Sequence, residues 1–216
     1  MKVNSIFKSI NGEVSNGVQG RMCTFIRLQG CNLKCAWCDT KYAQDPNGGI
    51  EMTIPQIIKE VKKNKCKYIT ITGGEPLLQR EELELLIDKL EYLHYEISVE
   101  TNGSFIIPDN WLCDYWVVDY KLNSSGMSDK MIALKDFGYY YSIIKFVIGD
   151  KNDFNQAIIL MKKIMKENKA NDFAFSPLFG KVSPNELLQW MKDKNLNDCI
   201  LNVQLHKLLN LDEPNI

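Results

Sequence analysis

Residues 22–40 read MCTFIRLQGCNLKCAWCDT. The first eight are rich in β-branched and aromatic side chains, which predicts a short strand over 22–29. Three cysteines follow this strand, Cys31, Cys35 and Cys38, with the spacing C-x3-C-x2-C. In folds built on parallel strands, active sites lie at the carboxyl ends of those strands. The segment therefore predicts a strand and a functional site together.

The rest of the chain alternates between short apolar runs and amphipathic segments. Further strands are predicted over 68–72, 96–100, 116–120, 140–148, 172–176 and 202–205. Helices are predicted over 53–63, 81–93, 129–137 and 153–167, and another begins with the sequence SPNE at 183–186. Thr53 with Gln56, and Ser183 with Glu186, have the spacing of capping boxes. This alternation is typical of βαβ units and predicts an α/β fold whose parallel sheet is open or a partial barrel.

The composition limits the class of protein. The 216 residues are 45% hydrophobic and 25% charged, which suits a packed core and excludes a disordered chain. No linker or repeat divides the sequence, so we expect a single domain over 1–216. The net charge of −1 gives no electrostatic reason to bind nucleic acid or an acidic membrane. Without a membrane-spanning apolar run or a signal-peptide core, we expect a cytoplasmic location.

The number of thiols favours one kind of metal site. The chain has seven cysteines, and an odd number in a reducing compartment argues against a disulfide framework. Structural zinc takes four ligands, usually in two pairs, but no second pair accompanies Cys31, Cys35 and Cys38, and His94 and His206 are isolated. Three thiolates without a fourth favour a 4Fe-4S cluster with one iron left open. Zinc completed by a distant residue, or free thiols, remain alternatives.

A second motif follows the strand predicted over 68–72. The sequence TGGEP at 72–76 places two glycines where backbone can approach a ligand closely. The Glu75 carboxylate beside them can accept hydrogen bonds from an ammonium group. Taken alone, the glycine pair is equally consistent with a tight strand-to-helix turn.

The two motifs together resemble the radical S-adenosylmethionine (SAM) superfamily. The resemblance implies a partial (β/α)6 barrel in which Cys31, Cys35 and Cys38 hold the 4Fe-4S cluster and SAM chelates its open iron. It also implies that an electron, from a donor such as flavodoxin or ferredoxin, cleaves SAM to a radical that abstracts a hydrogen atom from the substrate. The GGEP segment would contact the SAM amino group.

Further segments resemble one family within that superfamily, the 7-carboxy-7-deazaguanine synthases. They are SINGE at 9–13, FIRLQGCN at 25–32, CDT at 38–40, ETNGS at 100–104, KLNSS at 121–125 and QLHK at 204–207. The family implies a homodimeric lyase that converts 6-carboxy-5,6,7,8-tetrahydropterin to 7-carboxy-7-deazaguanine with loss of ammonia. That reaction belongs to queuosine biosynthesis, a tRNA modification pathway.

The resemblance assigns roles residue by residue. Arg27 would meet the substrate carboxylate, Glu13 with Ile10, Asn11 and Gly12 would bind the pterin ring, and Thr72 would also touch substrate. Thr40 would bind Mg²⁺ together with water and substrate oxygens. The implied SAM site consists of Gly74, Glu75, Asp119, Tyr120, Lys121 and Ser176, with Asn102 near the ribose.

The sequence departs from the family pattern at Asn11, Val14, Asp119-Tyr120 and the tail 208–216. Two other functions therefore stay open at this stage. One is an activase that installs a glycyl radical on a partner protein, which would share the three-cysteine spacing. The other is a zinc-binding interaction module without catalysis.

Overall fold

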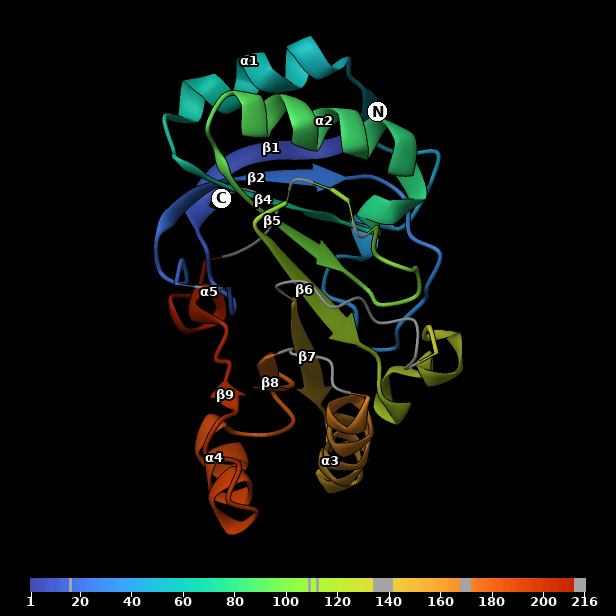
Figure 1. Cartoon of the computed structure of the whole chain (residues 1–216), viewed down its shortest axis with the longest axis vertical. Helices are drawn as coiled ribbons and strands as arrows, with labels where there is room; N and C mark the ends of the chain where they lie inside the picture. Colours follow the sequence, from blue (N-terminus) through green and yellow to red (C-terminus); the bar gives the residue numbers. More distant parts are fainter. Residues whose placement is uncertain (16, 109, 112, 134–141, 168–171, 212–216) are drawn as a thin grey trace.

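The computed structural model describes residues 1–15, 17–108, 110–111, 113–133, 142–167 and 172–211. Within them, nine strands form one sheet in the order β3-β1-β2-β4-β5-β6-β7-β8-β9 (Figure 1). β2 and β4–β9 run parallel, while β1 is antiparallel to β2 and β3 is antiparallel to β1. The strands are β1 Lys2–Ile10, β2 Met22–Leu28, β3 Ile50–Glu51, β4 Tyr68–Gly73, β5 Glu96–Thr101, β6 Tyr115–Tyr120, β7 Ser142–Ile148, β8 Asp172–Pro177 and β9 Ile200–Leu201. The predicted α/β fold with a parallel sheet is confirmed.

The described residues form five α-helices, α1 Ile54–Asn64, α2 Arg80–Tyr92, α3 Lys151–Lys166, α4 Pro184–Asp193 and α5 Leu205–Leu208. Two of them, α1 and α4, begin where the sequence places their caps, whereas α3 begins two residues before its predicted start and α5 was not predicted. At α1 the capping box of Thr53 and Gln56 is present, and at α4 the Ser183 side chain accepts a hydrogen bond from the Glu186 backbone N–H. These side chains satisfy N–H groups that a helix start leaves unpaired, so the local sequence sets both boundaries.

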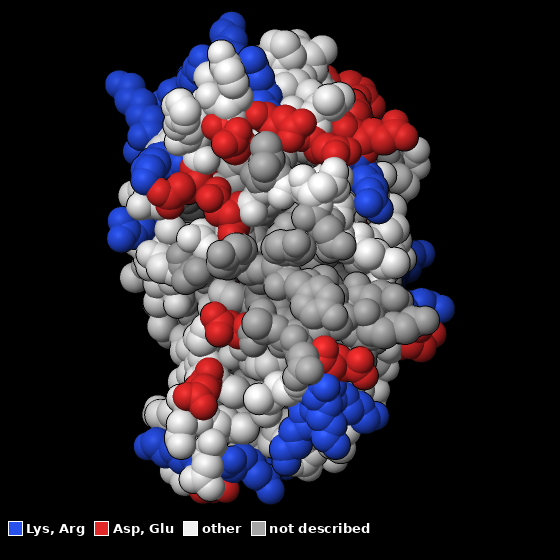
Figure 2. Space-filling view, in the orientation of Figure 1, with Lys and Arg blue, Asp and Glu red and all other residues white. Residues whose placement is uncertain are grey.

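Helix α2 illustrates how a helix covers the sheet. Its buried residues, Leu83, Leu86, Ile87 and Leu90, recur with helical spacing and join the core formed with the strands. The opposite side is solvated, and Figure 2 shows acidic side chains gathered over this part of the molecule. The predicted amphipathic helix is confirmed. In the described part of the chain, no helix is both long enough and apolar enough to cross a membrane.

The two faces of the sheet differ in chemistry because side chains alternate along each strand. On one face, buried apolar residues such as Ile71, Val99 and Phe146 pack in the two main core clusters with the helices. On the other face, the residues between them are polar near the carboxyl ends of the strands. Neighbouring strands bring these polar residues into register, as with Arg27 beside Thr72 and Asp119 beside Lys145.

Several predicted boundaries were wrong. β1 and β3 were not predicted, and the strand predicted over 202–205 is instead the short β9 before it and helix α5. The predicted helix over 129–137 is a 3-10 turn at Ser128–Lys130 in its described part, and residues 134–137 lie outside the described residues. Residues 140 and 141 of the predicted fifth strand also lie outside them.

The C-terminal segment contacts a segment from the opposite side of the sheet. After β9, the Asn202 side chain accepts a hydrogen bond from the Val14 backbone N–H at 2.9 Å, and the Leu205 N–H donates to the Gly12 carbonyl at 2.8 Å. The segment that follows β9 therefore contacts the segment that follows β1. This contact places α5 beside the polar face of the sheet.

Candidate active site

A pocket of about 400 Å³ opens at the carboxyl ends of the parallel strands. Most of the side chains that the sequence singled out line it together. They are Ile10, Asn11, Gly12, Glu13, Arg27, Cys31, Cys35, Cys38, Thr40, Thr72, Gly74, Asn102, Asp119, Lys121 and Ser176. Residues far apart in the chain thus converge on one cavity, as expected for the strand ends of this fold.

Two predicted SAM contacts do not line the pocket. Glu75 is fully buried, and its carboxylate accepts hydrogen bonds from Leu77 N, Thr101 Oγ1 and Asn102 N at 2.7–2.9 Å. Tyr120 packs its ring edge-on against Phe146 in the core. The carboxylate of Glu75 therefore organises backbone inside the protein, and the Tyr120 side chain belongs to the core.

The cysteine loop, residues 30–40, is fixed by the segments around it. Glu75 N donates to the Gly30 carbonyl at 2.8 Å, and Ala36 N donates to the Ser125 carbonyl at 2.9 Å. A Cβ at Gly74 would lie 2.1 Å from the Gly30 oxygen. Only glycine allows this approach, so the second motif is needed to hold the first in place.

One side of the pocket carries an ion pair that is largely shielded from solvent. The Lys145 ammonium contacts the Glu13 carboxylate, which also accepts a hydrogen bond from Gln204 Nε2 at 2.7 Å. Burial acts to raise the pKa of Glu13, but the charge and hydrogen bond of Lys145 and the bond from Gln204 outweigh it and leave that pKa below its usual value. Glu13 therefore stays ionised and is held in one orientation.

Glu100 lies in the same part of the pocket with a different character. Its Oε2 accepts a hydrogen bond from Thr72 Oγ1 at 2.8 Å. Burial, and then the negative charge of Glu13, raise the pKa of Glu100 to about 7 despite the opposing charge of Lys145. At neutral pH this carboxyl group can therefore either hold or release a proton.

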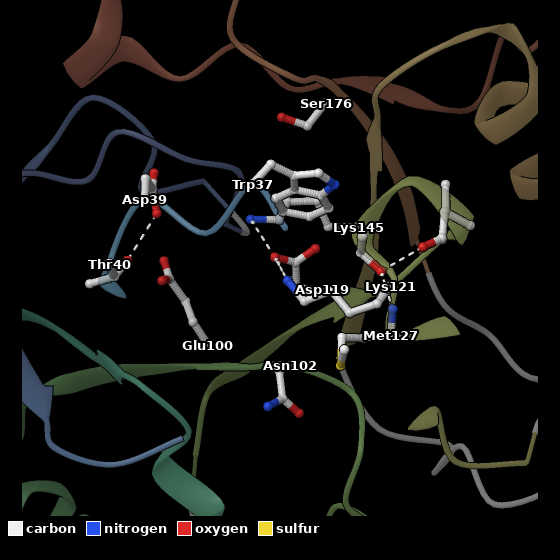
Figure 3. Close-up of polar contacts among 12 residues, drawn as sticks. Trp37, Asp39, Thr40, Glu100, Asn102, Asp119, Lys121, Met127, Lys145 and Ser176 are labelled. Carbon is white, nitrogen blue, oxygen red and sulfur yellow. Dashed lines mark hydrogen bonds and ion pairs between the residues drawn. The ribbon is translucent and has the colours of Figure 1, made fainter. Parts of the chain in front are cut away.

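Asp119 connects the two sides of the pocket (Figure 3). Its Oδ2 accepts a hydrogen bond from Lys121 Nζ at 2.7 Å and lies 3.7 Å from Lys145 Nζ. Lys121 Nζ in turn lies 5.0 Å from the centre of the Trp37 ring, within the cysteine loop. Burial acts to lower the pKa of both lysines, but Asp119 and the other acidic groups outweigh it and raise each pKa above the usual value. Both lysines are charged.

Arg27 offers a cationic surface for an anion. It is 6% exposed, and its guanidinium lies 5.8 Å from the Phe7 ring centre and 5.7 Å from that of Tyr42. Contacts with ring faces favour the charged group and fix its plane. A guanidinium fixed in this way in a pocket wall suits a carboxylate.

Oxygen donors lie at the end of the cysteine loop. Thr40 Oγ1 donates a hydrogen bond to Asp39 Oδ1 at 2.9 Å (Figure 3). Asp39 Oδ2 lies 3.7 Å from Lys207 Nζ. The Thr40 hydroxyl keeps acceptor capacity toward the pocket. A hydroxyl with water and substrate oxygens is a donor set that fits Mg²⁺.

Comparison with known proteins places the chain in a family. The model of the radical SAM superfamily matches residues 25–193. A 7-carboxy-7-deazaguanine synthase from Clostridium acetobutylicum is 36% identical over 96% of this chain and 95% of its own length. One from Koribacter versatilis is 34% identical over 97% of this chain and 96% of its own length. The chain belongs to the 7-carboxy-7-deazaguanine synthase family of radical SAM enzymes.

A solved structure agrees with this radical SAM assignment at the level of the fold. The crystal structure of QueE from Escherichia coli superposes with a TM-score of 0.73 over 95% of this chain and 94% of that one, at 21% identity. Membership of the superfamily implies a 4Fe-4S cluster and SAM. The alternative of a zinc-binding module without catalysis is therefore wrong, and the Clostridium and Koribacter relatives are named as synthases rather than activases.

The cysteines fit such a cluster. All three are free thiols that line the pocket. Burial raises the pKa of the Cys31 and Cys35 thiols, and negative charge on Cys38 raises it further, so three bare thiolates would repel one another. A cationic iron centre removes that penalty. Among the described residues, no three His, Cys, Asp or Glu side chains are grouped to hold a single metal ion.

Two functional candidates, Lys145 and Glu100, were not singled out from the sequence, although Glu100 begins the ETNGS segment. A signal for Lys145 exists in β7, where one lysine interrupts the apolar run SIIKFVI. A charged residue within a buried strand is rare unless it is paired. The pattern could therefore have marked Lys145 as a pocket residue, but it could not have named Glu13 or Asp119 as its partners.

Proposed function

We propose that this radical SAM enzyme converts 6-carboxy-5,6,7,8-tetrahydropterin to 7-carboxy-7-deazaguanine with loss of ammonia. The observation that carries the proposal is the convergence of Arg27, Glu13 and the three cluster cysteines on one cavity of about 400 Å³. That volume lies within the range of small-molecule sites. When bound, the cluster and SAM supply the radical that abstracts a hydrogen atom from the substrate.

Recognition of the substrate is assigned to two groups of opposite charge, each of which binds a different part of the pterin. The Arg27 guanidinium pairs with the pterin carboxylate, because its planar fork matches two carboxylate oxygens. The Glu13 carboxylate accepts hydrogen bonds from the N–H groups of the 2-amino-4-oxo ring. Lys145 and Gln204 hold Glu13 ionised and oriented for that contact. Ile10, Asn11, Gly12 and Thr72 complete the same wall.

Glu100 is the candidate for proton transfer. Loss of ammonia requires the departing nitrogen to gain protons, and a carboxyl group with a pKa of about 7 is suited to donate one at neutral pH. Oε2 accepts the Thr72 hydroxyl proton, so we assign the transferred proton to Oε1. Glu13, whose pKa is lowered, cannot take this role in the same pH range.

The remaining pocket residues are assigned to the cofactors. Gly74, Lys121, Asp119 and Ser176 line the part of the cavity proposed for SAM. Thr40 is proposed to bind Mg²⁺ with substrate oxygens and water. A one-electron donor such as flavodoxin or ferredoxin, and a homodimeric assembly, remain predictions of the family resemblance.

The test is anaerobic incubation of the reconstituted protein with dithionite, SAM, Mg²⁺ and 6-carboxytetrahydropterin, followed by mass spectrometry. We expect 7-carboxy-7-deazaguanine to form in many turnovers. Formation of 5′-deoxyadenosine without this product would retain the radical chemistry and reject the substrate. Omission of Mg²⁺ from a parallel reaction tests the role given to Thr40.

A further inference from the structure

Asn102 follows β5 and lines the pocket, yet its side chain is directed at the cysteine loop. It is 7% exposed. Its Nδ2 lies 3.7 Å from Cys31 Sγ and donates to Asn32 Oδ1 at 3.0 Å. The family resemblance places Asn102 near the SAM ribose, but in this structure both donor directions of the amide lead to residues of the cysteine loop.

Hydrogen bonds to the oxygen of this amide fix its orientation. Asn102 Oδ1 accepts hydrogen bonds from Ser104 N at 3.0 Å and from Ser104 Oγ at 2.6 Å. A flipped amide would place its NH2 group against these donors, so Nδ2 must face Cys31. The backbone of Asn102 is held in turn, because its N–H donates to the buried carboxylate of Glu75 at 2.7 Å.

We propose that Asn102 raises the reduction potential of the cluster by donating a hydrogen bond to Cys31 Sγ. Reduction adds one electron from an external donor to the cluster and increases the negative charge on its sulfur ligands. A hydrogen-bond donor at a ligating sulfur stabilises that reduced state and raises the potential. No covalent bond forms or breaks and no proton is transferred in this step.

Cys31 receives a second hydrogen bond, from the Leu33 backbone N–H at 3.4 Å. That donor is part of the chain and remains in any side-chain variant, so substitution of Asn102 isolates one of two contributions. Ser104 acts as a positioning residue, since it fixes the amide without touching the cysteine. The inference rests on the cluster that the radical SAM assignment implies and is independent of the pterin substrate.

The experiment compares four proteins after anaerobic cluster reconstitution: the parent, Asn102→Ala, Ser104→Ala and the control Asn185→Ala. Asn185 lies on an exposed position of α4, remote from the cysteine loop in sequence and on a different element. The midpoint potential of the cluster is measured without SAM by redox titration monitored by electron paramagnetic resonance. We expect a shift to more negative potential in Asn102→Ala, a smaller shift of the same sign in Ser104→Ala, and none in Asn185→Ala.

An unchanged potential in Asn102→Ala would overturn the proposal. Weaker SAM binding with an unchanged SAM-free potential would overturn it in favour of a ribose contact. Should Asn102→Ala fail to take up iron, Asn102→Leu decides the question, because leucine keeps a similar volume but lacks the amide donor, and an unshifted potential there contradicts the role given to Asn102. Ser104→Ala cannot decide it alone, since the Ser104 backbone N–H still bonds to Asn102 Oδ1. No pterin is present, so a failure of the proposed substrate cannot be confused with either result.

Discussion

Replacement of Glu100 by glutamine should make the protein more stable at alkaline pH and leave its stability unchanged in acid. The structure raises the pKa of this carboxyl group from 4.5 to about 7, first through burial and then through the charge of Glu13. The folded state therefore binds the proton more tightly than the unfolded state does. The stabilisation due to this group is complete below pH 4.5 and is lost as the pH rises through 7.

The size of the effect follows from the same pKa values. At about 1.4 kcal/mol for each pKa unit, the ionised Glu100 costs the folded protein up to roughly 3 kcal/mol well above pH 7. Glutamine has a similar shape, keeps an oxygen that can accept the Thr72 hydrogen bond, and carries no charge at any pH. The free energy of unfolding of Glu100→Gln, relative to the parent, should therefore rise between about pH 5 and pH 8.

Urea unfolding of the cluster-free protein at several pH values from 5 to 8 measures this difference. Groups that do not interact with Glu100 titrate alike in both proteins, and their contributions cancel in the comparison. Glu81→Gln is the matched control, since Glu81 is an exposed carboxylate in the first turn of α2. Parallel stability curves for the parent and Glu100→Gln would refute the raised pKa, and with it the proton-transfer role given to this residue.

Three further outcomes are expected. Arg27→Ala should weaken pterin binding about 100-fold or more, the loss of two charge-assisted hydrogen bonds, while anaerobic calorimetry finds SAM binding unchanged; retained pterin affinity contradicts the carboxylate contact. Gly74→Ala, whose Cβ would lie 2.1 Å from a backbone oxygen of the cysteine loop, should abolish iron uptake and lower the melting temperature. The control for that variant is Gly126→Ala: with φ +71° and no atom within 4 Å of the new Cβ, it should lower the free energy of unfolding by only about 1–2 kcal/mol and retain iron. Lys145→Met leaves the largely buried Glu13 carboxylate with the Gln204 hydrogen bond but without a neighbouring cation and should destabilise the fold by about 3 kcal/mol, part of which Glu13→Gln in the same chain restores. Equal stability of parent and Lys145→Met would show that solvent screens the ion pair.

Local sequence patterns predicted those elements that depend on local interactions. The capping box at Thr53 places the start of α1 correctly, and the apolar spacing of α2 marks its buried side. β1 escaped prediction because its pairing with β2 shifts register between Val3 and Ser5, which breaks the alternation that identifies a strand. The strand predicted over 202–205 fails because the pairing of β9 with β8 ends at Leu201 and the Leu205 N–H bonds to the Gly12 carbonyl, where α5 begins.

The same division applies to the site. The three cysteines lie within one short segment and GGEP forms another, so the local pattern of each was enough to predict that both lie at strand ends. The ion pairs of the pocket depend on which strands are neighbours and on their register. Asp119 meets Lys145 only because β6 pairs with β7 at those positions, and no pattern within either strand carries that information. Glu75 shows the converse, since its motif was evident but the burial of its carboxylate was not.

The charges of the pocket connect substrate binding to the proton on Glu100. Glu13 and Asp119 contact Lys145 and Lys121, and alongside Lys145 the positive charge of Arg27 acts on Glu100. That charge is one of the factors that lower the pKa of Glu100 against burial and Glu13. A carboxylate bound to Arg27 cancels it and brings a further negative charge into the cavity, so the pKa of Glu100 must rise when the pterin binds. If the pterin carboxylate binds Arg27 as proposed, we therefore expect binding at neutral pH to take up a proton at Glu100.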